Sequence, residues 1–537
     1  MTGARHSPGP QATLLAIAAW LAWQPAETHP WSAVLTAAVV LALAVWGWRR
    51  TPAALARGLA AAAGAGVLLL AAGLSGWDPA SAVSELGLLA AVAGLVWLAS
   101  REAPSDRRPA LLALLLSGLA LWGLWQVVAG FDSATTKVVE LPEPMRFAAA
   151  ERLASGRAFA SQMLPSHLAV LLATALPLLV ARVRWRWSAA LWIVGSILCI
   201  VGLVLTRSPV GIGLALAACA ALGLGGRGSR MLVAVPALAV ALTAVVFWRG
   251  DVLEFEPVLL RLDNWHTALW VWSTAPAAGV GPAGFAQAAQ GVPFVVGNRP
   301  RHAHSLPLEW LAELGPVGLL AFVVIAFGLW RLIRALWPHR PELAVAVAVI
   351  PLHNLVDFSL FGSGVALPWA VLLGWAIACR PQKAAAEVAP GGRPFLVLVA
   401  TLALALTLLH ATSRTVGEAA ALRTSAEERL AGALQARRLA PWRVEPLGLV
   451  AAASLESGDR GRISVAAEEL DRARWLRPRS AALAGLRARL GLALGEGPTA
   501  VSEAWCAHQQ RPHGEEHTRF FEALLLQLDR EAERAGR

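Results

Sequence analysis

Residues 299–336, RPRHAHSLPLEWLAELGPVGLLAFVVIAFGLWRLIRAL, join a charged stretch to an apolar run. The run from 314 to 336 is long enough to cross a bilayer, which takes about 20 apolar residues. The stretch ahead of it, 299–315, holds two arginines, two histidines and two glutamates. Ionisable residues at a membrane boundary are functional candidates. This segment therefore predicts a transmembrane helix that begins beside a functional polar loop.

The whole chain repeats such apolar runs. Of its 537 residues, 57% are apolar and only 15% are charged, whereas soluble domains carry roughly 25% charged residues. We expect an all-α, polytopic membrane protein of about 12–13 transmembrane helices, the first of them an uncleaved N-terminal span. The predicted spans are 11–24, 31–48, 55–76, 83–99, 109–130, 166–183, 188–206, 209–225, 231–248, 314–336, 342–358, 364–379 and 394–412.

Arginines alternate between the connecting loops and so predict orientation. The short loops 25–30, 77–82 and 359–363 carry no Lys or Arg. The loops on the other side are basic: Arg49–Arg50, Arg101–Arg107–Arg108, Arg182–Arg184–Arg186, Arg227–Arg230, Arg331–Arg334–Arg340 and Arg380–Lys383–Arg393. Basic loops stay cytoplasmic. We therefore place the N-terminus in the cytoplasm, and the loops 131–165 and 249–313 and the tail 413–537 outside.

The net charge of +11 does not require a nucleic-acid partner, because many of the arginines sit in these short loops. The two outer loops are nevertheless basic, with Lys137, Arg146, Arg152, Arg157, Arg249, Arg261, Arg299 and Arg301, and Arg207 lies at an outer helix end. An anionic ligand at the outer surface is the simplest reason. The alternative is that long loops translocate whatever their charge. The four cysteines show neither a disulfide framework nor metal-ligand spacing.

The tail predicts a helical repeat. Prolines at 441, 478 and 512 are separated by 37 and 34 residues, close to the 34-residue tetratricopeptide period. We expect two domains, a transmembrane domain over 1–412 and a tetratricopeptide-like α-helical domain over 413–537. Arrays of this kind bind partners on a concave face, so a protein partner is expected.

Four outer segments carry candidate chemistry. In 261–287, the spacing of Arg261 and Trp265 suits an amphipathic helix that ends in the Gly-rich turn GVGPAGF, which lacks a phosphate-loop lysine. In the second segment, His302 and His304 precede Glu313, and a histidine there can take a proton near neutral pH or simply be solvated.

The other two segments are at helix ends. Arg207, in LTRSPVGIG, can grip a diphosphate with two hydrogen bonds or reach the lipid headgroups. His353 and Asp357 are four residues apart on one predicted helix face, which suits either a functional pair or a buried pair that fixes helix packing.

Together these residues resemble the bacterial O-antigen ligase/polymerase superfamily, over about residues 100–380. The resemblance rests on Arg261-x3-Trp265, Pro276, Gly279-Val280-Gly281, Phe285, Ala303-His304-Ser305, Leu308, Glu313-Leu314-Gly315 and Gly318, and on residues 156–178 ahead of an earlier span. Two positions differ. Where the family commonly has Ser-Arg-Gly this chain has Thr206-Arg207-Ser208, and the Asn after the family's histidine is Ser305.

The resemblance implies a metal-independent glycosyltransferase without a cofactor, in the bacterial inner membrane. Its donor would be a glycan on undecaprenyl diphosphate, and its acceptor a hydroxyl of lipid A–core (ligase), another glycan (polymerase) or a protein (oligosaccharyltransferase). His304 would act as general base or orient the acceptor, and Glu313 would orient His304 or cap the helix. The diphosphate and glycan would be bound by Arg261, Arg207, Arg157, Arg301, Trp265, His302, His353 and Asp357.

Three other classes are less favoured. A metal enzyme could draw ligands from His302, His304, Glu309, His353 and Asp357, but no metal-binding motif occurs. A transporter of lipid-linked glycan would place its polar residues at mid-membrane, and here they lie at the outer ends of spans. A scaffold that recruits partners through the tail leaves the loop histidines unexplained.

Overall fold

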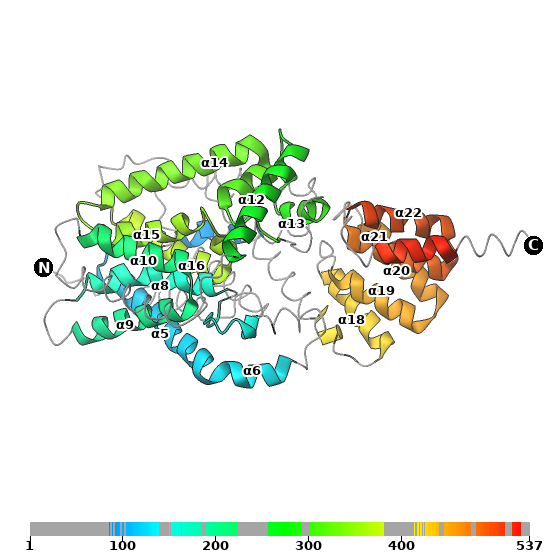
Figure 1. Cartoon of the computed structure of the whole chain (residues 1–537), viewed down its shortest axis with the longest axis horizontal. Helices are drawn as coiled ribbons and strands as arrows, with labels where there is room; N and C mark the ends of the chain where they lie inside the picture. Colours follow the sequence, from blue (N-terminus) through cyan, green and yellow to red (C-terminus); the bar gives the residue numbers. More distant parts are fainter. Residues whose placement is uncertain are drawn as a thin grey trace, which may run out of the picture. The chain divides into compact units, whose positions relative to one another are not determined.

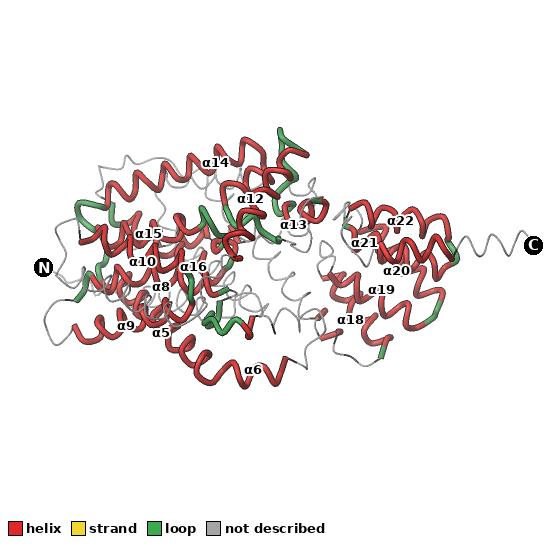
Figure 2. Tube along the Cα trace, in the orientation of Figure 1, coloured by secondary structure: helices red, strands yellow, loops and turns green. Residues whose placement is uncertain are grey.

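The computed structural model of the chain describes residues 104–138, 152–162, 164–183, 189–223, 256–292, 300–380, 426–439, 445–473, 480–510 and 518–527. It also describes residues 85, 88–89, 92–96, 99–100 and 150, and scattered positions between 413 and 425. Within these residues the chain is all helix and loop, with no strand (Figure 2). The predicted all-α class is confirmed for this part of the chain.

Two of the described helical segments, Arg107–Thr136 and Leu306–Leu336, are long and apolar enough to cross a membrane. Five shorter apolar helices coincide with other predicted spans: Pro165–Val180, Ala190–Thr206, Pro209–Leu222, Pro341–His353 and Ser363–Ala378. The predicted spans 11–24, 31–48, 55–76, 231–248 and 394–412 lie outside the described residues. The number of crossings and their orientation remain predictions.

The chain divides into two compact units, each made of three segments, and one of the boundaries falls within a helix, between Phe322 and Val323. The first unit holds the apolar helices around α8, and the second holds α12, the start of α14 and the C-terminal helices. The predicted domain boundary at residue 412 lies outside the described residues, so that division remains a prediction.

Helix α8 (Pro165–Val180) is the centre of the first unit, and all of its residues are buried. It packs against α5 (Arg107–Trp125), α9 (Ala190–Thr206), α10 (Pro209–Leu222) and α15 (Pro341–His353), as Figure 1 shows. The π-turn η2 (Gln126–Gly130) and α6 (Phe131–Val138) continue α5, and η6 (Ser359–Phe361) and α16 (Ser363–Ala378) follow α15. A helix that is apolar on every side is stable only when neighbours surround it, and α8 meets that condition.

The turn between α9 and α10 follows from three consecutive residues. Arg207 ends α9 in the left-handed backbone region, at φ 48° and ψ 37°. The Ser208 side chain accepts the backbone N–H of Gly211 at 3.4 Å, and Pro209 takes the first helical position, where its missing N–H costs nothing. The sequence RSP therefore stops one helix and starts the next, and it leaves the Arg207 side chain exposed.

The second unit begins with α12 (Glu256–Thr274), followed by the turn 275–284, which we call the glycine turn. Next come α13 (Phe285–Ala288) and η5 (Ala289–Gly291). Residues 300–305, which we call the histidine loop, then lead into α14 (Leu306–Leu336). This helix begins eight residues before the predicted span at 314, because the polar entry is itself helical up to a kink at Gly315, where φ is 64° and ψ is −155°.

The C-terminal helices are short and similar in length. They are α18 (Ala426–Leu439), α19 (Glu445–Ser457), α20 (Arg460–Ala473), α21 (Ala481–Leu494) and α22 (Gly497–Gln510). Each packs on the next in sequence, and alanines and leucines fill the space between them. The Arg487 guanidinium contacts Asp471 at 3.1 Å and Glu496 at 3.0 Å, so one charged group joins residues of three successive segments.

Candidate functional site

The glycine turn is fastened to the kink in α14. Pro316 has no N–H, so the carbonyl of Ala312 cannot be satisfied within the helix. That carbonyl instead accepts the N–H of Val280 at 3.0 Å, and the carbonyl of Glu313 accepts the N–H of Gly281 at 2.9 Å. The GVG sequence thus satisfies the carbonyls that the kink exposes, and these two N–H groups are not free to bind a phosphate.

Two glycines permit this close approach. A Cβ on Gly279, whose φ is 70°, would lie 2.2 Å from the carbonyl carbon of Glu313. A Cβ on Gly315 would lie 2.7 Å from the carbonyl oxygen of Ala277. Both positions also have the left-handed backbone that L side chains rarely adopt. The conformation of α14 at its kink therefore depends on glycine at both 279 and 315.

The buried Glu313 carboxylate completes the same junction. Its Oε1 accepts the backbone N–H of Phe285 at 3.2 Å, at the start of α13. Phe285 is fully buried in a core made largely of alanines, which lets α12, α13 and α14 pack closely. The predicted part of Glu313 in orienting His304 remains a proposal, whereas its contact with α13 is a feature of the fold.

The histidine loop is held against α12. His304 lies in the left-handed region at φ 53°, an unfavourable conformation for a non-glycine residue. The indole Nε1 of Trp265 donates a hydrogen bond to the His304 carbonyl oxygen at 3.2 Å. Such backbone strain concentrates at functional sites when surrounding contacts sustain it. Trp265 and His304, predicted from the sequence as parts of one site, are in direct contact.

The predicted site arginines Arg261 and Arg301 are differently exposed. Arg261 is half-buried and lies on α12 one helical turn before Trp265, so both side chains share a face of the helix. Arg301 is exposed and lies three residues before His304 in the histidine loop. The helix predicted around Arg261 is confirmed as α12, and the compact turn predicted after it is the glycine turn.

His302 and Glu309 form an ion pair next to His304. Nδ1 of His302 lies 2.7 Å from Oε1 of Glu309, and Oε2 of Glu309 accepts the N–H of Ala303 at 3.0 Å. Burial lowers the pKa of His302, but the charge and hydrogen bond of Glu309 outweigh burial and raise the pKa above 6.5. The pair therefore favours a protonated His302.

In the first unit, Arg157 and Arg207 are brought together by the backbone. Nε of Arg157 donates to the carbonyl of Thr206 at 2.9 Å, and a terminal nitrogen lies 3.4 Å from the carbonyl oxygen of Arg207. Gln126, in η2, accepts the N–H of Ala160 at 2.7 Å and donates to its carbonyl at 2.9 Å. Two arginines separated by 50 residues in the sequence thus flank one helix turn. That the pair binds an anion remains a prediction.

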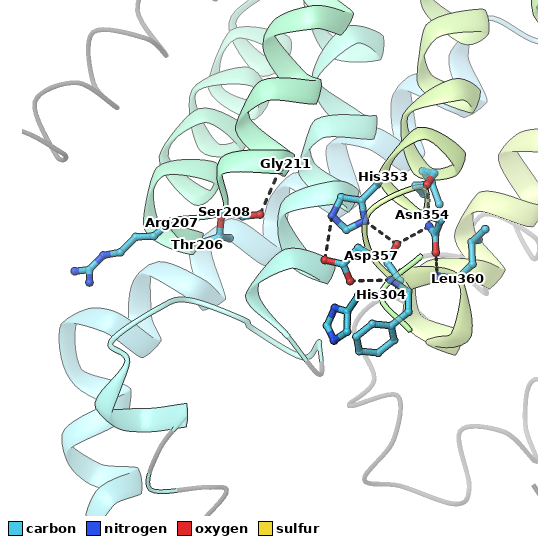
Figure 3. Close-up of polar contacts among 12 residues, drawn as sticks. Thr206, Arg207, Ser208, Gly211, His304, His353, Asn354, Asp357 and Leu360 are labelled. Atoms are coloured by element: carbon cyan, nitrogen blue, oxygen red, sulfur yellow. Dashed lines mark hydrogen bonds and ion pairs between the residues drawn. The ribbon is translucent and has the colours of Figure 1, made fainter. Parts of the chain in front are cut away.

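His353 and Asp357 are close, but the helix that was predicted to carry both residues, 342–358, ends at His353. Helix α15 ends at His353, and Asp357 lies in the following loop, with 3.7 Å between His353 Nε2 and Asp357 Oδ2 (Figure 3). Asn354 ends the helix because its side chain accepts the N–H of Leu360 at 3.0 Å and donates to Ser359 at 2.9 Å. Asp357 in turn accepts the N–H of Phe358 at 2.8 Å.

These contacts make a buried polar network that closes the loop between α15 and η6. His353 Nδ1 is 3.1 Å from the Ser359 hydroxyl, so both nitrogens of this ring face protein groups. Of the two alternatives for His353 and Asp357, this geometry favours helix packing. A role for the pair in binding substrate remains a proposal.

Three residues of these clusters were not among the predicted site residues. Glu309 was considered only as a metal ligand, although a glutamate in the first turn of a helix can reach back to the preceding loop. Gln126 is a polar residue inside an apolar run, and it lies in a π-turn, a feature that is frequent at functional sites. His167 is buried on α8, with its ring edge-on to Phe358 at 5.3 Å. The feature of the sequence that could have identified each of them is a polar residue among apolar neighbours.

No group of three or more His, Cys, Asp or Glu side chains suited to a metal ion occurs among the described residues. The described residues do include two His–carboxylate pairs, His302 with Glu309 and His353 with Asp357. The prediction that the chemistry needs no metal stays a prediction.

Residues 194–323 match the family model described as O-antigen ligase. The match begins in α9 and includes the Arg207 turn, α12, the glycine turn, the histidine loop and the first part of α14. No curated protein matches the chain. The family match supports the O-antigen ligase superfamily, and thereby an enzyme of glycan assembly that is embedded in a membrane.

Proposed function

We propose that the chain transfers a glycan from an undecaprenyl-diphosphate carrier to an acceptor hydroxyl, as an O-antigen ligase-like enzyme of surface polysaccharide assembly. The reaction takes place at the periplasmic face of the bacterial inner membrane. The observation that carries this proposal is the family match over 194–323, because it contains both the exposed Arg207 and the strained His304 held by Trp265.

In this mechanism the acceptor O–H bond breaks and its proton passes to the His304 imidazole. The acceptor oxygen forms a bond to the anomeric carbon of the donor sugar. The bond from that carbon to the diphosphate oxygen breaks, and undecaprenyl diphosphate leaves with the electron pair. Proton removal of this kind contributes typically 10²–10⁴-fold to a rate. His304 can hold or release a proton near neutral pH, which suits the part.

The diphosphate is bound by arginines. The candidate residues are Arg261, Arg301, Arg207 and Arg157, because guanidinium groups bind phosphate oxygens in bidentate fashion. They stabilise the negative charge that grows on the leaving group, which is an electrostatic contribution to catalysis. No nucleotide is needed as an energy source, because the diphosphate linkage supplies the energy, and we propose that the arginines take the place of a metal ion at the leaving group.

A single displacement with inversion at the anomeric carbon is the expected stereochemistry. Retaining glycoside hydrolases use a carboxylate as nucleophile, and a retaining double displacement here would need such a group. The two carboxylates next to the histidine loop are buried and occupied, Glu309 by His302 and Ala303 and Glu313 by the N–H of Phe285. Neither is presented as a nucleophile.

The acceptor decides between members of the superfamily, and a deletion strain separates them. Loss of all surface O-chain with lipid-linked polymer retained indicates a ligase acting on lipid A–core. Chains of a single unit indicate a polymerase, and unmodified protein indicates a protein O-oligosaccharyltransferase. Retention of lipid-linked glycan on the cytoplasmic side would indicate a transporter instead and contradict the proposal.

The role of His304 is tested in the same strain with a His304→Ala protein. We expect loss of transfer with normal amounts of protein in the membrane, because the variant removes the base but not the Trp265 contact to the backbone. A folded His304→Ala protein that transfers glycan at the native rate would remove this mechanism.

We also propose that residues 413–537 form a tetratricopeptide-like array that binds a protein partner. Helix α18 begins at 426 and α20 at 460, a spacing of 34 residues, and α19 and α21 begin at 445 and 481, a spacing of 36. A photo-crosslinking amino acid in place of the exposed Val465 on α20 tests this proposal. A single cross-linked protein supports it, and cross-links to lipid alone would contradict it.

A further inference from the structure

The Glu309 carboxylate holds two consecutive residues of the histidine loop. One oxygen lies 2.7 Å from Nδ1 of His302, and the other accepts the N–H of Ala303 at 3.0 Å. The carboxylate is only 1% exposed, so its contacts are formed in the near absence of water. Hydrogen bonds to charged groups are stronger than neutral ones, and both oxygens are occupied.

Glu309 is also anchored to a rigid element. It lies in the first turn of α14, and its own N–H donates to the carbonyl of Ser305 at 2.9 Å. The carboxylate therefore holds residues 302 and 303, while the backbone of the same residue holds 305. His304 lies between these points, and its carbonyl is held from α12 by Trp265.

A loop fixed on both sides of one residue leaves that residue little freedom. The left-handed backbone of His304 is unfavourable for an L residue, and it persists only when neighbouring contacts impose it. The backbone conformation determines where the imidazole can point. The contacts of Glu309 are thus suited to aiming the ring of His304 without touching the reacting atoms.

We propose that Glu309 is the positioning residue of His304, acting through its two-point contact with His302 and Ala303. This inference rests on the proposed function, because it assigns Glu309 a part in the same glycan transfer. It also gives different roles to the two glutamates in the N-terminal part of α14. Glu309 positions the histidine loop, and Glu313 joins α14 to α13.

The charges around His302 agree with an ionised pair. His302 faces Glu309 and Glu85, which favour its protonated form, and Arg301, which opposes it. Burial also opposes protonation, but the net effect raises the pKa of His302. Removing one partner of a buried ion pair destabilises the fold, because the charge of the other partner is left buried without compensation.

The test compares two substitutions of Glu309 in the full-length protein. Glu309→Gln keeps the length and two polar atoms of the side chain, whereas Glu309→Ala removes both contacts. Asp263→Asn serves as the matched control, because Asp263 is an exposed carboxylate on α12 of the same unit. Each variant is expressed in the deletion strain, and the transfer rate is measured in membranes of that strain. These membranes contain the strain's own lipid-linked glycan and acceptor. Binding is measured with undecaprenyl diphosphate.

We expect Glu309→Ala to slow transfer by about 100-fold, the effect of misplacing a catalytic group by about 1 Å. Glu309→Gln should retain transfer within about tenfold of the native rate, since it restores the loop contacts without the charge. The affinity for undecaprenyl diphosphate should stay unchanged in both. A residue that only supported folding would lower affinity, rate and protein level together.

Transfer by Glu309→Ala at the native rate would overturn the proposal, as would a Glu309→Gln protein as slow as Glu309→Ala. If Glu309→Ala does not accumulate in the membrane, His302→Asn replaces it, because it removes one of the two contacts. An intermediate loss with His302→Asn supports the proposal, and a native rate contradicts it. His304→Ala is assayed alongside: full transfer there defeats the proposed function, whereas loss there with native Glu309→Ala defeats only this inference.

Discussion

The indole N–H of Trp265 donates a hydrogen bond to the carbonyl oxygen of His304, across 39 residues of sequence and at 3.2 Å. This bond joins α12 to the histidine loop and helps to hold His304 at a φ of 53°. The contact is to the backbone carbonyl of His304 and does not involve the imidazole.

Trp265→Phe removes this N–H and keeps most of the aromatic surface. A neutral hydrogen bond contributes about 1 kcal/mol net, so we expect transfer to fall by about 5- to 10-fold with little change in melting temperature. The matched control is Trp505→Phe, on α22, which should leave the rate unchanged. An unaltered rate in Trp265→Phe would show that the bond does not position His304.

Gly279→Ala should disrupt the junction between the glycine turn and α14. The added Cβ would lie 2.2 Å from the Glu313 carbonyl carbon, and φ at this position is 70°, so we expect a loss of stability of about 2 kcal/mol or more. Gly328→Ala, on the same helix, has open space around its Cβ and should be neutral or slightly stabilising. Thermal unfolding of the two purified proteins compares them, and equal melting temperatures would contradict the packing described.

Arg207→Ala and Arg157→Ala should separate binding from stability. Arg207 is exposed, so its removal should lower the affinity for undecaprenyl diphosphate about tenfold without changing the melting temperature. Arg157 also donates to the Thr206 carbonyl at 2.9 Å, so its removal should lower both affinity and stability. Native affinity in Arg207→Ala would exclude that residue from the anion site.

We expect the difference in stability between the native protein and His302→Asn to depend on pH. Because Glu309 raises the pKa of His302 in the folded state, protonation favours folding. The stabilisation is fully present below the unfolded pKa of about 6.5 and is lost as pH rises through the higher folded pKa. The native protein should therefore exceed His302→Asn in melting temperature most at about pH 6 and least at about pH 8.5. A gap that widens toward alkaline pH would contradict the ion pair.

His353→Ala tests the buried network between α15 and η6. Both ring nitrogens face protein groups, and the side chain is fully buried, so we expect a loss of about 2–4 kcal/mol of stability from the cavity and the broken contacts. Affinity for undecaprenyl diphosphate should stay unchanged in the folded fraction. A stable His353→Ala protein with weakened binding would favour a role for His353 in binding substrate.

The sequence was sufficient for the all-α class of the described residues and for several of the helices that carry the predicted site residues. Periodic apolar runs predicted the helices, because a bilayer or a buried core requires long apolar segments. The pattern from Arg261 to Gly318 identified α12, the glycine turn and the histidine loop, and the family match over 194–323 covers them. Local chemistry also fixed the turn at Arg207, since Ser and Pro after it start a helix wherever they occur.

The tertiary structure decided which groups meet, because contacts between distant residues depend on backbone geometry that no local pattern encodes. The kink at Gly315 exposes carbonyls of α14, and these accept hydrogen bonds from the N–H groups of the GVG sequence. Burial of Glu309 made it a partner of His302 and Ala303, and Asn354 ended α15 before Asp357. Arg157 and Arg207 came together through the carbonyls at the end of α9, a contact set by the packing of helices and not by the order of residues.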